Sequence, residues 1–304
     1  MAAQGVAGQT QQLQQANATT TTAGTTTQGV VSLPYHWDKR HKGQAGQARF
    51  ELQFDLDSLP TESYGIYLPR LGNAYAIWLN GHLLQHNGDL ASGNGADFAK
   101  APRYVDITPG LLQRHNQIVI QIRADVGRRG GLAPVTVGPE SEVRTLHRSD
   151  HQWRITGSEA VAIANLLVAL IALALWATQV DNSIPGKPQR DCLYLFAGLA
   201  ELSWALRVAD AAIEQPPLDW PWWGMLTIAA LTAWVCSMVL FCVEVAGWRR
   251  LASLTWLRRW LAVLMATSLP AGYLAMVTGK PVALTLQYAA LATAQRYAPP
   301  STDA

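Results

Sequence analysis

The second half of the chain contains long stretches without a charged residue, and these limit its fold more than any other feature. Residues 160–178 consist mainly of Ala, Leu, Ile and Val, and residues 222–243 and 260–279 are also free of charge. At a rise of about 1.5 Å per residue, such a helix is just long enough to cross a hydrocarbon core of about 30 Å. Several such stretches with Trp at their ends predict membrane helices rather than helices of a soluble core.

Two further stretches are weaker candidates for membrane helices. Residues 192–213 are apolar but contain charged side chains, and residues 281–295 are short, nearer in length to a re-entrant segment. We therefore expect four or five helices, with the lipid bilayer as a partner. The predicted helical domain covers residues 158–295, with helices at about 160–178, 192–213, 222–244, 260–279 and 281–295 and a polar tail at 296–304.

The first half of the chain has the pattern of β-strands. In residues 49–56, apolar and polar side chains alternate strictly, as in a strand with one buried face. Residues 75–79 and 118–122 repeat this alternation, and the pair Asn80 and Gly81 is a strong hairpin signal. Shorter runs bring the total to six or seven strands. We expect an α+β multidomain fold class, in which an all-β sandwich or jelly roll over residues 31–150 precedes the helical bundle.

The beginning of the chain is low in sequence complexity. Residues 1–30 are rich in Gln, Thr, Ala and Gly and contain no aromatic residue, so we expect this segment to be disordered. It lacks the basic start and apolar core of a signal peptide. Either the true translation start lies elsewhere, or the first membrane helix translocates the preceding domain unaided.

Charge and cysteine content exclude several classes of protein. The formal net charge is +2, which gives no reason to expect a nucleic-acid partner. The three cysteines, Cys192, Cys236 and Cys242, lie in apolar runs without a CxxC pair or a nearby group of histidines. We interpret them as small buried apolar residues. No disulfide, metal or cofactor is expected.

The loops between the predicted helices alternate in positive charge. Residues 179–190 contain two Lys or Arg residues and residues 247–259 contain four, whereas residues 214–221 contain none. The positive-inside rule places the basic loops in the cytoplasm, so the β-domain is expected outside, in the periplasm or extracellular space. Three arginines shortly before residue 160 weigh against this orientation.

Several motifs resemble known families. The sequences "SLPYHW" (32–37), "YAIWLNGHLL" (75–84) and "VDITPGLLQRHNQIVIQIRAD" (105–125) are similar to galactose-binding-like jelly rolls, which occur as sugar-binding domains in family 2 glycosidases. A jelly roll followed by membrane helices resembles the bacterial 7TMR-DISM receptors. In those receptors an extracytoplasmic ligand-binding domain precedes seven helices and a signalling output such as a histidine kinase. The stretch "YLFAGLAELSWALR" (194–207) resembles the second helix of such sensor kinases.

The resemblance implies a sensor or input portion of a two-component receptor in the bacterial inner membrane. It further implies a small-molecule or saccharide ligand, a homodimer and a cytoplasmic signalling partner. The chain departs from the family in its number of helices and in the absence of a kinase His box or ATP lid after Gln295. We therefore expect an input half that ends before the kinase.

Aromatic and polar residues around the predicted hairpin are the candidate ligand contacts. Trp78, Asn80 and His82 could line a pocket by stacking and hydrogen bonding, as could Trp37. The alternative is that Trp78 only covers a sheet face and that Asn80 only forms the turn. Residues 86–97 carry His and Asp residues that suggest a Ca²⁺ or sugar loop, although the spacing matches no EF-hand and a solvated loop is the simpler interpretation.

Charged residues inside the apolar stretches are candidates for signalling. Charges in a membrane span are costly and usually face a partner or a water-filled cavity. Arg207 and Asp210 are three residues apart, so they share a helix face and could neutralise each other; alternatively, they reach the outer interface. Glu201 lies deeper, and Glu244 ends the third long stretch.

Two further functions remain open. The first is a membrane-anchored carbohydrate-binding protein without signalling output, although an anchor needs only one helix. The second is a membrane enzyme such as a glycosyl or acyl transferase, for which the sequence offers no catalytic constellation. Residues 127–131, "GRRGG", lack the Lys-Ser/Thr ending of a phosphate-binding loop, and Asp55 and Asp57 have no catalytic domain around them. No catalytic residue is predicted.

Overall fold

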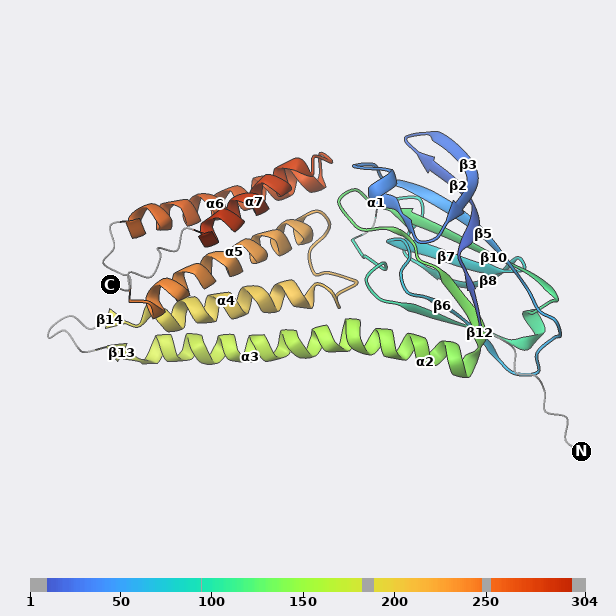
Figure 1. Cartoon of the computed structure of the whole chain (residues 1–304), viewed down its shortest axis with the longest axis horizontal. Coiled ribbons are helices and arrows are strands. Elements are labelled where there is room, and N and C mark those ends of the chain that lie inside the picture. Colours follow the sequence, from blue (N-terminus) through green and yellow to red (C-terminus); the bar gives the residue numbers. More distant parts are fainter. Residues whose placement is uncertain (1–9, 94, 182–188, 248–252, 297–304) are drawn as a thin grey trace, which may run out of the picture. The chain divides into compact units, whose positions relative to one another are not determined.

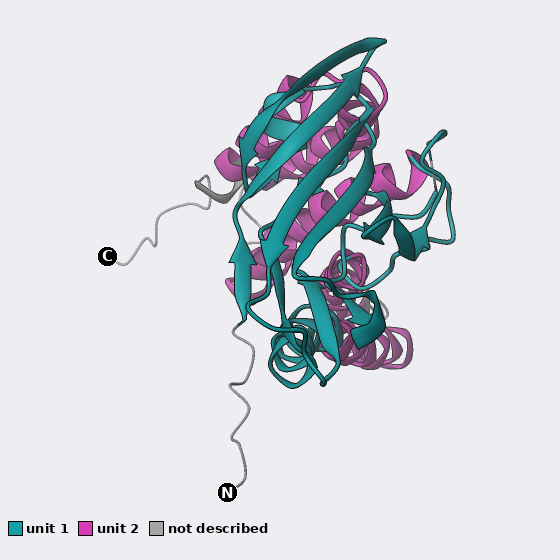
Figure 2. Ribbon diagram, turned by 90° about the vertical axis from the view of Figure 1, so that its right-hand side faces the viewer, with its two compact units in different colours: residues 1–157, 211–220 teal, residues 158–210, 221–304 magenta. Residues whose placement is uncertain are grey.

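The computed structural model of the protein describes residues 10–93, 95–181, 189–247 and 253–296. The chain divides into two compact units, shown in teal and magenta in Figure 2. Unit 1 comprises residues 1–157 together with 211–220, and unit 2 comprises residues 158–210 and 221–304. The short segment 211–220 therefore belongs to the unit built by the first half of the chain.

Unit 1 is a sandwich of two antiparallel sheets, whose strands appear in blue and green in Figure 1. A six-stranded sheet has the order β3-β2-β5-β10-β7-β8, and a four-stranded sheet has the order β1-β12-β6-β9. The pair β11-β4 forms a small third sheet. The strands are β1 Gln11–Leu13, β2 Gln15–Thr22, β3 Thr25–Ser32, β4 Tyr35–His36, β5 Gly46–Asp55, β6 Tyr64–Leu68, β7 Ala74–Leu79, β8 His82–Asn87, β9 Arg103–Ile107, β10 His115–Ala124, β11 Gly131–Leu132 and β12 Val135–Pro139.

The apolar side chains of each alternating strand form the inner face of the sandwich. In β5, Phe50, Leu52 and Phe54 are buried, and the residues between them form the outer face. They join the inward residues of the other strands in one apolar core. The β7–β8 hairpin turns at Asn80 and Gly81, whose φ angles of 50° and 84° suit a two-residue turn. The predicted β-sandwich is confirmed.

The prediction of a disordered segment over residues 1–30 does not hold for residues 10–30. Strands β1, β2 and β3 form there, and β2 pairs with both β3 and β5. Ala16 and Ala18 alternate with exposed residues and enter the core. Thr has a high β-propensity, and pairing with β5 satisfies the backbone of β2 even without large side chains. Residues 1–9 lie outside the described part of the chain.

Two short helical segments lie between strands of the sandwich, α1 Trp37–Arg40 and the 3₁₀ turn Pro109–Leu111. The longer helices follow β12. They are α2 Glu140–His151, a π-helical segment Gln152–Thr156, α3 Gly157–Thr178, α4 Cys192–Ala209, α5 Trp222–Val245, α6 Ser253–Met276 and α7 Val282–Arg296. The short strands β13 Val180–Asp181 and β14 Gln189–Arg190 pair after α3. α2, the π-helical segment and α3 form one uninterrupted helix, Glu140–Thr178.

Three of these helices are long and apolar enough to cross a membrane: Glu140–Thr178, Cys192–Ala209 and Trp222–Val245. This supports membrane association. Helix α6 carries Arg258 and Arg259 near its start and Pro270 inside it, and α7 holds a shorter apolar stretch, Val282–Thr293. The prediction of four or five membrane helices therefore stays a prediction.

Within unit 2, α5 has the most enclosed surface. Val235 and Val243 of α5 pack with leucines of α6 and α7, and Trp204 of α4 lies against Trp234 of α5 with ring centroids 4.6 Å apart. By contrast, α3 buries only Ala162, Ala169 and Ala172. Most of its larger apolar side chains are exposed, as expected for a helix whose surface faces lipid.

Candidate functional site

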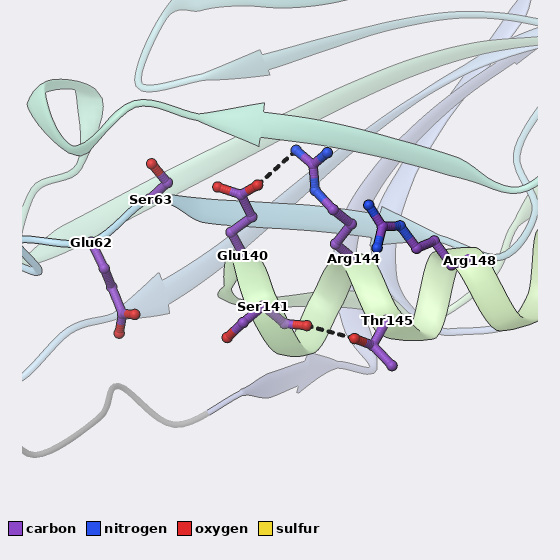
Figure 3. Close-up of a pocket in the computed structure, with 7 residues that line it drawn as sticks. All are labelled: Glu62, Ser63, Glu140, Ser141, Arg144, Thr145 and Arg148. Carbon is purple, nitrogen blue, oxygen red and sulfur yellow. Dashed lines mark hydrogen bonds and ion pairs between the residues drawn. The ribbon is translucent and has the colours of Figure 1, made fainter.

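A polar cavity of about 480 Å³ lies beside helix α2 in unit 1 (Figure 3). Helix α2 begins directly after β12, so its first three turns stand next to the loop that leads into β6. Both elements contribute hydroxyl and charged side chains but no aromatic ring. The lining residues are Glu62, Ser63, Glu140, Ser141, Arg144, Thr145 and Arg148.

Ion pairs hold one side of this cavity in place. The guanidinium of Arg144 lies 2.8 Å from a carboxylate oxygen of Glu140 and 2.8 Å from one of Asp106. It also stacks over the ring of Tyr104 at 4.8 Å. The side chain of Arg148 is exposed and makes no ion pair with any residue that the structure describes. The cavity thus combines one fixed and one available guanidinium with hydroxyl groups.

The far end of α2 is tied to the sandwich. Asp150 accepts a hydrogen bond of 2.7 Å from the hydroxyl of Tyr67 and lies 3.0 Å from Nη1 of Arg154. Arg154, in the π-helical segment, also donates to the carbonyl oxygens of Pro69 at 2.6 Å and Lys100 at 2.8 Å. Burial and the bond to Asp150 raise the pKa of Tyr67, so the hydroxyl keeps its proton and remains a donor.

The outer face of the six-stranded sheet holds a second, smaller cavity of about 100 Å³. Strand register places Thr19, Arg49 and Gln121 in one row across β2, β5 and β10. Leu90, in the loop after β8, lies at the edge of this cavity, and its carbonyl oxygen accepts a hydrogen bond of 2.6 Å from Gln47 Nε2. We refer to it as the sheet-face cavity.

The candidate ligand contacts from the sequence line neither cavity. The ring of Trp37 is only 1% exposed, and its Nε1 donates to Gln44 O at 2.8 Å. Asn80 bonds Leu111 O and Asn116 through its Nδ2, which supports the turn interpretation. Trp78 is half-buried on the outer sheet face and His82 is exposed. A role in ligand binding stays a prediction for all four residues.

The carboxylates of Asp89 and Asp97 accept hydrogen bonds from neighbouring residues of the sandwich. Asp97 accepts a hydrogen bond of 2.7 Å from Asn73, and Asp89 accepts bonds from Ala91 N and from Ser92. The bonds from Ser92 and Ala91 lower the pKa of Asp89. Among the described residues, no group of three or more His, Cys, Asp or Glu side chains could hold a metal ion.

The charged residues inside the helices of unit 2 have distinct surroundings. Arg207 and Asp210 form an ion pair of 3.5 Å, and Asp210 also accepts a hydrogen bond of 2.6 Å from Trp223. The carboxylate of Glu244 is buried, 3.9 Å from Arg258. The half-buried Glu201 has no hydrogen bond or ion pair with any described side chain. Their role in signalling stays a prediction.

Sequence reasoning missed both cavities. Thr19 falls in the segment expected to be disordered, and the residues of α2 that line the larger cavity fall in the range 31–150, which was expected to be all β. The clearest available signal was the helical spacing of Glu140, Arg144 and Arg148, which places their charges on one face of a helix.

No family model matches this chain, and no curated protein matches it. Among solved structures, it is similar to a GH2 β-galacturonidase from Eisenbergiella tayi bound to galacturonate, at 14% identity and a TM-score of 0.31, over 43% of this chain and 24% of that one. An FMN-binding β-glucuronidase from Faecalibacterium prausnitzii L2-6 matches at 16% identity and a TM-score of 0.31, over 41% of this chain and 22% of that one.

A β-glucuronidase from Ruminococcus gnavus in complex with uronic isofagomine matches at 11% identity and a TM-score of 0.32, over 46% of this chain and 29% of that one. The chain therefore spans less than a third of the length of these enzymes. Likenesses this weak carry no weight for ligand or activity.

Proposed function

We propose that the chain is the input part of a membrane receptor. Its sandwich binds a small polar ligand outside the cytoplasm, and its helices relay the bound state across the membrane. The observation that carries this proposal is the position of helix α2. Most residues lining the larger cavity lie on α2, which continues through the π-helical segment into α3 without interruption. A ligand there acts directly on a helix whose continuation is apolar enough to enter a membrane.

The lining of the cavity favours a ligand rich in hydroxyl or carboxylate groups, such as a saccharide or a sugar acid. Arg148 can donate to a carboxylate or to several hydroxyl oxygens. Glu62 can accept hydrogen bonds from hydroxyls, and Ser63 and Ser141 can do either. The volume of about 480 Å³ falls in the ordinary range for small-molecule sites.

Loop charges support an orientation with the sandwich in the periplasm or extracellular space of a bacterium. The chain would cross the inner membrane several times, and Glu201, Arg207, Asp210 and Glu244 would couple the helices to one another. The output would be a cytoplasmic histidine kinase of a two-component system. The resemblance of residues 194–207 to sensor kinases supports that part of the proposal.

Thermal unfolding of the full chain in lipid nanodiscs tests ligand binding. Neutral monosaccharides, uronic acids and short oligosaccharides are screened against the wild type, Arg148→Ala and the control Arg114→Ala, which removes an exposed arginine away from the cavity. A ligand at 100 times its Kd stabilises the folded state by about 2.7 kcal/mol. We expect Arg148→Ala to lose that stabilisation and Arg114→Ala to keep it. The proposal is overturned if no compound stabilises the wild type, or if Arg148→Ala responds as the wild type does.

Hydrogen exchange in the same samples separates a receptor from a mere anchor. A receptor requires that the ligand alters protection in the π-helical segment or in the helices of unit 2. Binding that leaves these amides unchanged would instead favour a membrane-anchored carbohydrate-binding protein without signalling output.

A further inference from the structure

The segment that connects α4 to α5 is held by the sandwich. We call residues 211–220 the connecting segment; it belongs to unit 1 although both neighbouring helices belong to unit 2. The backbone N–H of Asp97 donates to Glu214 O at 2.7 Å, and Lys100 Nζ donates to Ile213 O at 2.9 Å. The guanidinium of Arg103 forms an ion pair with the carboxylate of Glu214.

A second set of contacts fixes the end of the connecting segment next to α5. The guanidinium of Arg128 lies 4.4 Å from the ring centroid of Trp220, and Trp220 Nε1 donates to Val126 O at 3.2 Å. The side chain of Arg128 is 3% exposed and donates to the carbonyl oxygens of Gly95 and Ala96, each at 2.7 Å. The β8–β9 loop therefore positions the guanidinium of Arg128, against which the ring of Trp220 packs.

The same loop contacts the helix that leaves the sandwich. The carbonyl oxygen of Lys100 accepts a hydrogen bond from Arg154 in the π-helical segment, while Lys100 Nζ reaches Ile213 in the connecting segment. Lys100 thus forms hydrogen bonds with both segments that lead from unit 1 into unit 2, the π-helical segment and the connecting segment.

Hydrogen bonds join this loop to the sheet-face cavity. Arg123 donates to Asp125 at 2.8 Å and to Ala91 O at 2.9 Å, next to Leu90 at the edge of the cavity. Asn73 is fully buried; its Nδ2 donates to Asp97 and its Oδ1 accepts from the N–H of Asp125. These hydrogen bonds fix the conformation of the loop against the sheet.

We propose that residues 95–103, the second part of the β8–β9 loop together with the first residue of β9, are a clamp that docks the connecting segment and so restrains the adjoining ends of α4 and α5. This gives the sandwich a second mechanical link to the helices, besides the continuous helix Glu140–Thr178. The role of the clamp in signalling rests on the proposed receptor function. The docking itself does not, because it requires no ligand.

A partly buried ion pair lies at the centre of the clamp. The side chains of Arg103 and Glu214 are 16% and 23% exposed, so each charge depends on the other for compensation. Burial raises the pKa of the Glu214 carboxyl, and the Arg103 guanidinium opposes that shift. The docking contacts described above are hydrogen bonds to backbone oxygens, one ion pair and one cation–π contact, so release can occur without opening the apolar core.

The experiment measures hydrogen exchange in the full chain in lipid nanodiscs without any ligand. The variants are Arg103→Met, Glu214→Gln and the control Asp219→Asn, which removes an exposed carboxylate from the same segment. We expect Arg103→Met and Glu214→Gln to accelerate exchange about tenfold or more at residues 211–220 and at the adjoining ends of α4 and α5. The control should match the wild type, and amides of β5 and β10 should keep their protection.

Two results would overturn the clamp. In the first, exchange of the connecting segment is the same in Glu214→Gln and wild type. In the second, Glu214→Gln accelerates exchange throughout the sandwich, which would make the pair part of the global fold. Because no ligand is used, failure here leaves the ligand-binding result of the proposed function standing, and the reverse also holds.

Discussion

The indole of Trp37 shares its surroundings with a histidine. The rings of Trp37 and His41 lie with centroids 4.3 Å apart, and His41 Nε2 is 2.6 Å from the hydroxyl of Tyr35. Burial, with a smaller contribution from Arg40, lowers the pKa of His41 below its ordinary value of 6.5. His41 is therefore neutral in the folded protein at pH values where it would take up a proton in the unfolded chain.

We predict a pH-dependent loss of stability from this histidine. Because its folded pKa is the lower one, the stabilisation is complete above the unfolded pKa and is lost as pH falls towards the folded pKa. The thermal midpoint of the wild type should fall from about pH 7.5 to about pH 5.5. His41→Gln should show a smaller fall, and the exposed His36→Gln should behave as the wild type. Identical pH profiles for all three would contradict the assignment.

Single residues were predictable where the signal was local. Asn80 and Gly81 adopt the turn that their dipeptide predicts, because turn conformation depends on adjacent residues. The ion pair of Arg207 and Asp210 follows from helical spacing alone. By contrast, the pairing of Arg103 with Glu214 joins residues more than a hundred positions apart, and no local pattern in one sequence marks it.

Helix α2 and the sheet beneath it form the element that links the larger cavity to α3. Tyr67 and Arg154 both bond Asp150, and these contacts set where the helix leaves the sandwich. We predict that Asp150→Asn lowers the free energy of unfolding by about 1–2 kcal/mol, since it weakens hydrogen bonds to a charged group. It should also increase hydrogen exchange in the π-helical segment Gln152–Thr156.

The matched control for this prediction is Asp106→Asn. Asp106 pairs with Arg144 on the same helix, but its carboxylate is 64% exposed, so its loss should cost less than about 1 kcal/mol. Chemical denaturation compares the two variants. Equal destabilisation by both would show that Asp150 does not fix the helix.

At the scale of elements, prediction succeeded where buried and exposed side chains differ strongly in polarity. The alternation in β5 and β10 made those strands recognisable. Strands β2 and β3 were not predicted, because Thr occupies both of their faces. Successive residues therefore do not alternate between apolar and polar side chains. Their formation depends on the partner strand β5, which a local pattern cannot supply.

The division into a β-rich part and a helical part follows from composition, and the two units largely reproduce it. The membership of the connecting segment in unit 1 does not follow from composition, because it depends on tertiary contacts. Orientation belongs to the same scale, since it depends on charge summed over all loops. It remains a prediction and can be measured directly.

We predict that residue 113 is accessible from outside the cell and residue 187 from the cytoplasm. In a variant lacking the three native cysteines, Gln113→Cys and Lys187→Cys are labelled with a membrane-impermeant maleimide. Intact cells, with the outer membrane permeabilised where one is present, should show labelling of Gln113→Cys only. Lys187→Cys should label after lysis, and the reverse pattern would place the sandwich in the cytoplasm.

The π-helical segment also determines what kind of movement the long helix can carry. An α-helix turns by about 100° per residue, and a π turn takes up one additional residue. Rewinding of Gln152–Thr156 as α-helix would therefore swing every side chain beyond Gly157 about the helix axis by roughly a quarter of a circle. The alanine face of α3 would then point to different neighbours at almost unchanged depth. In the proposed receptor, the signal would then be a rotation of this helix about its axis rather than a shift along it.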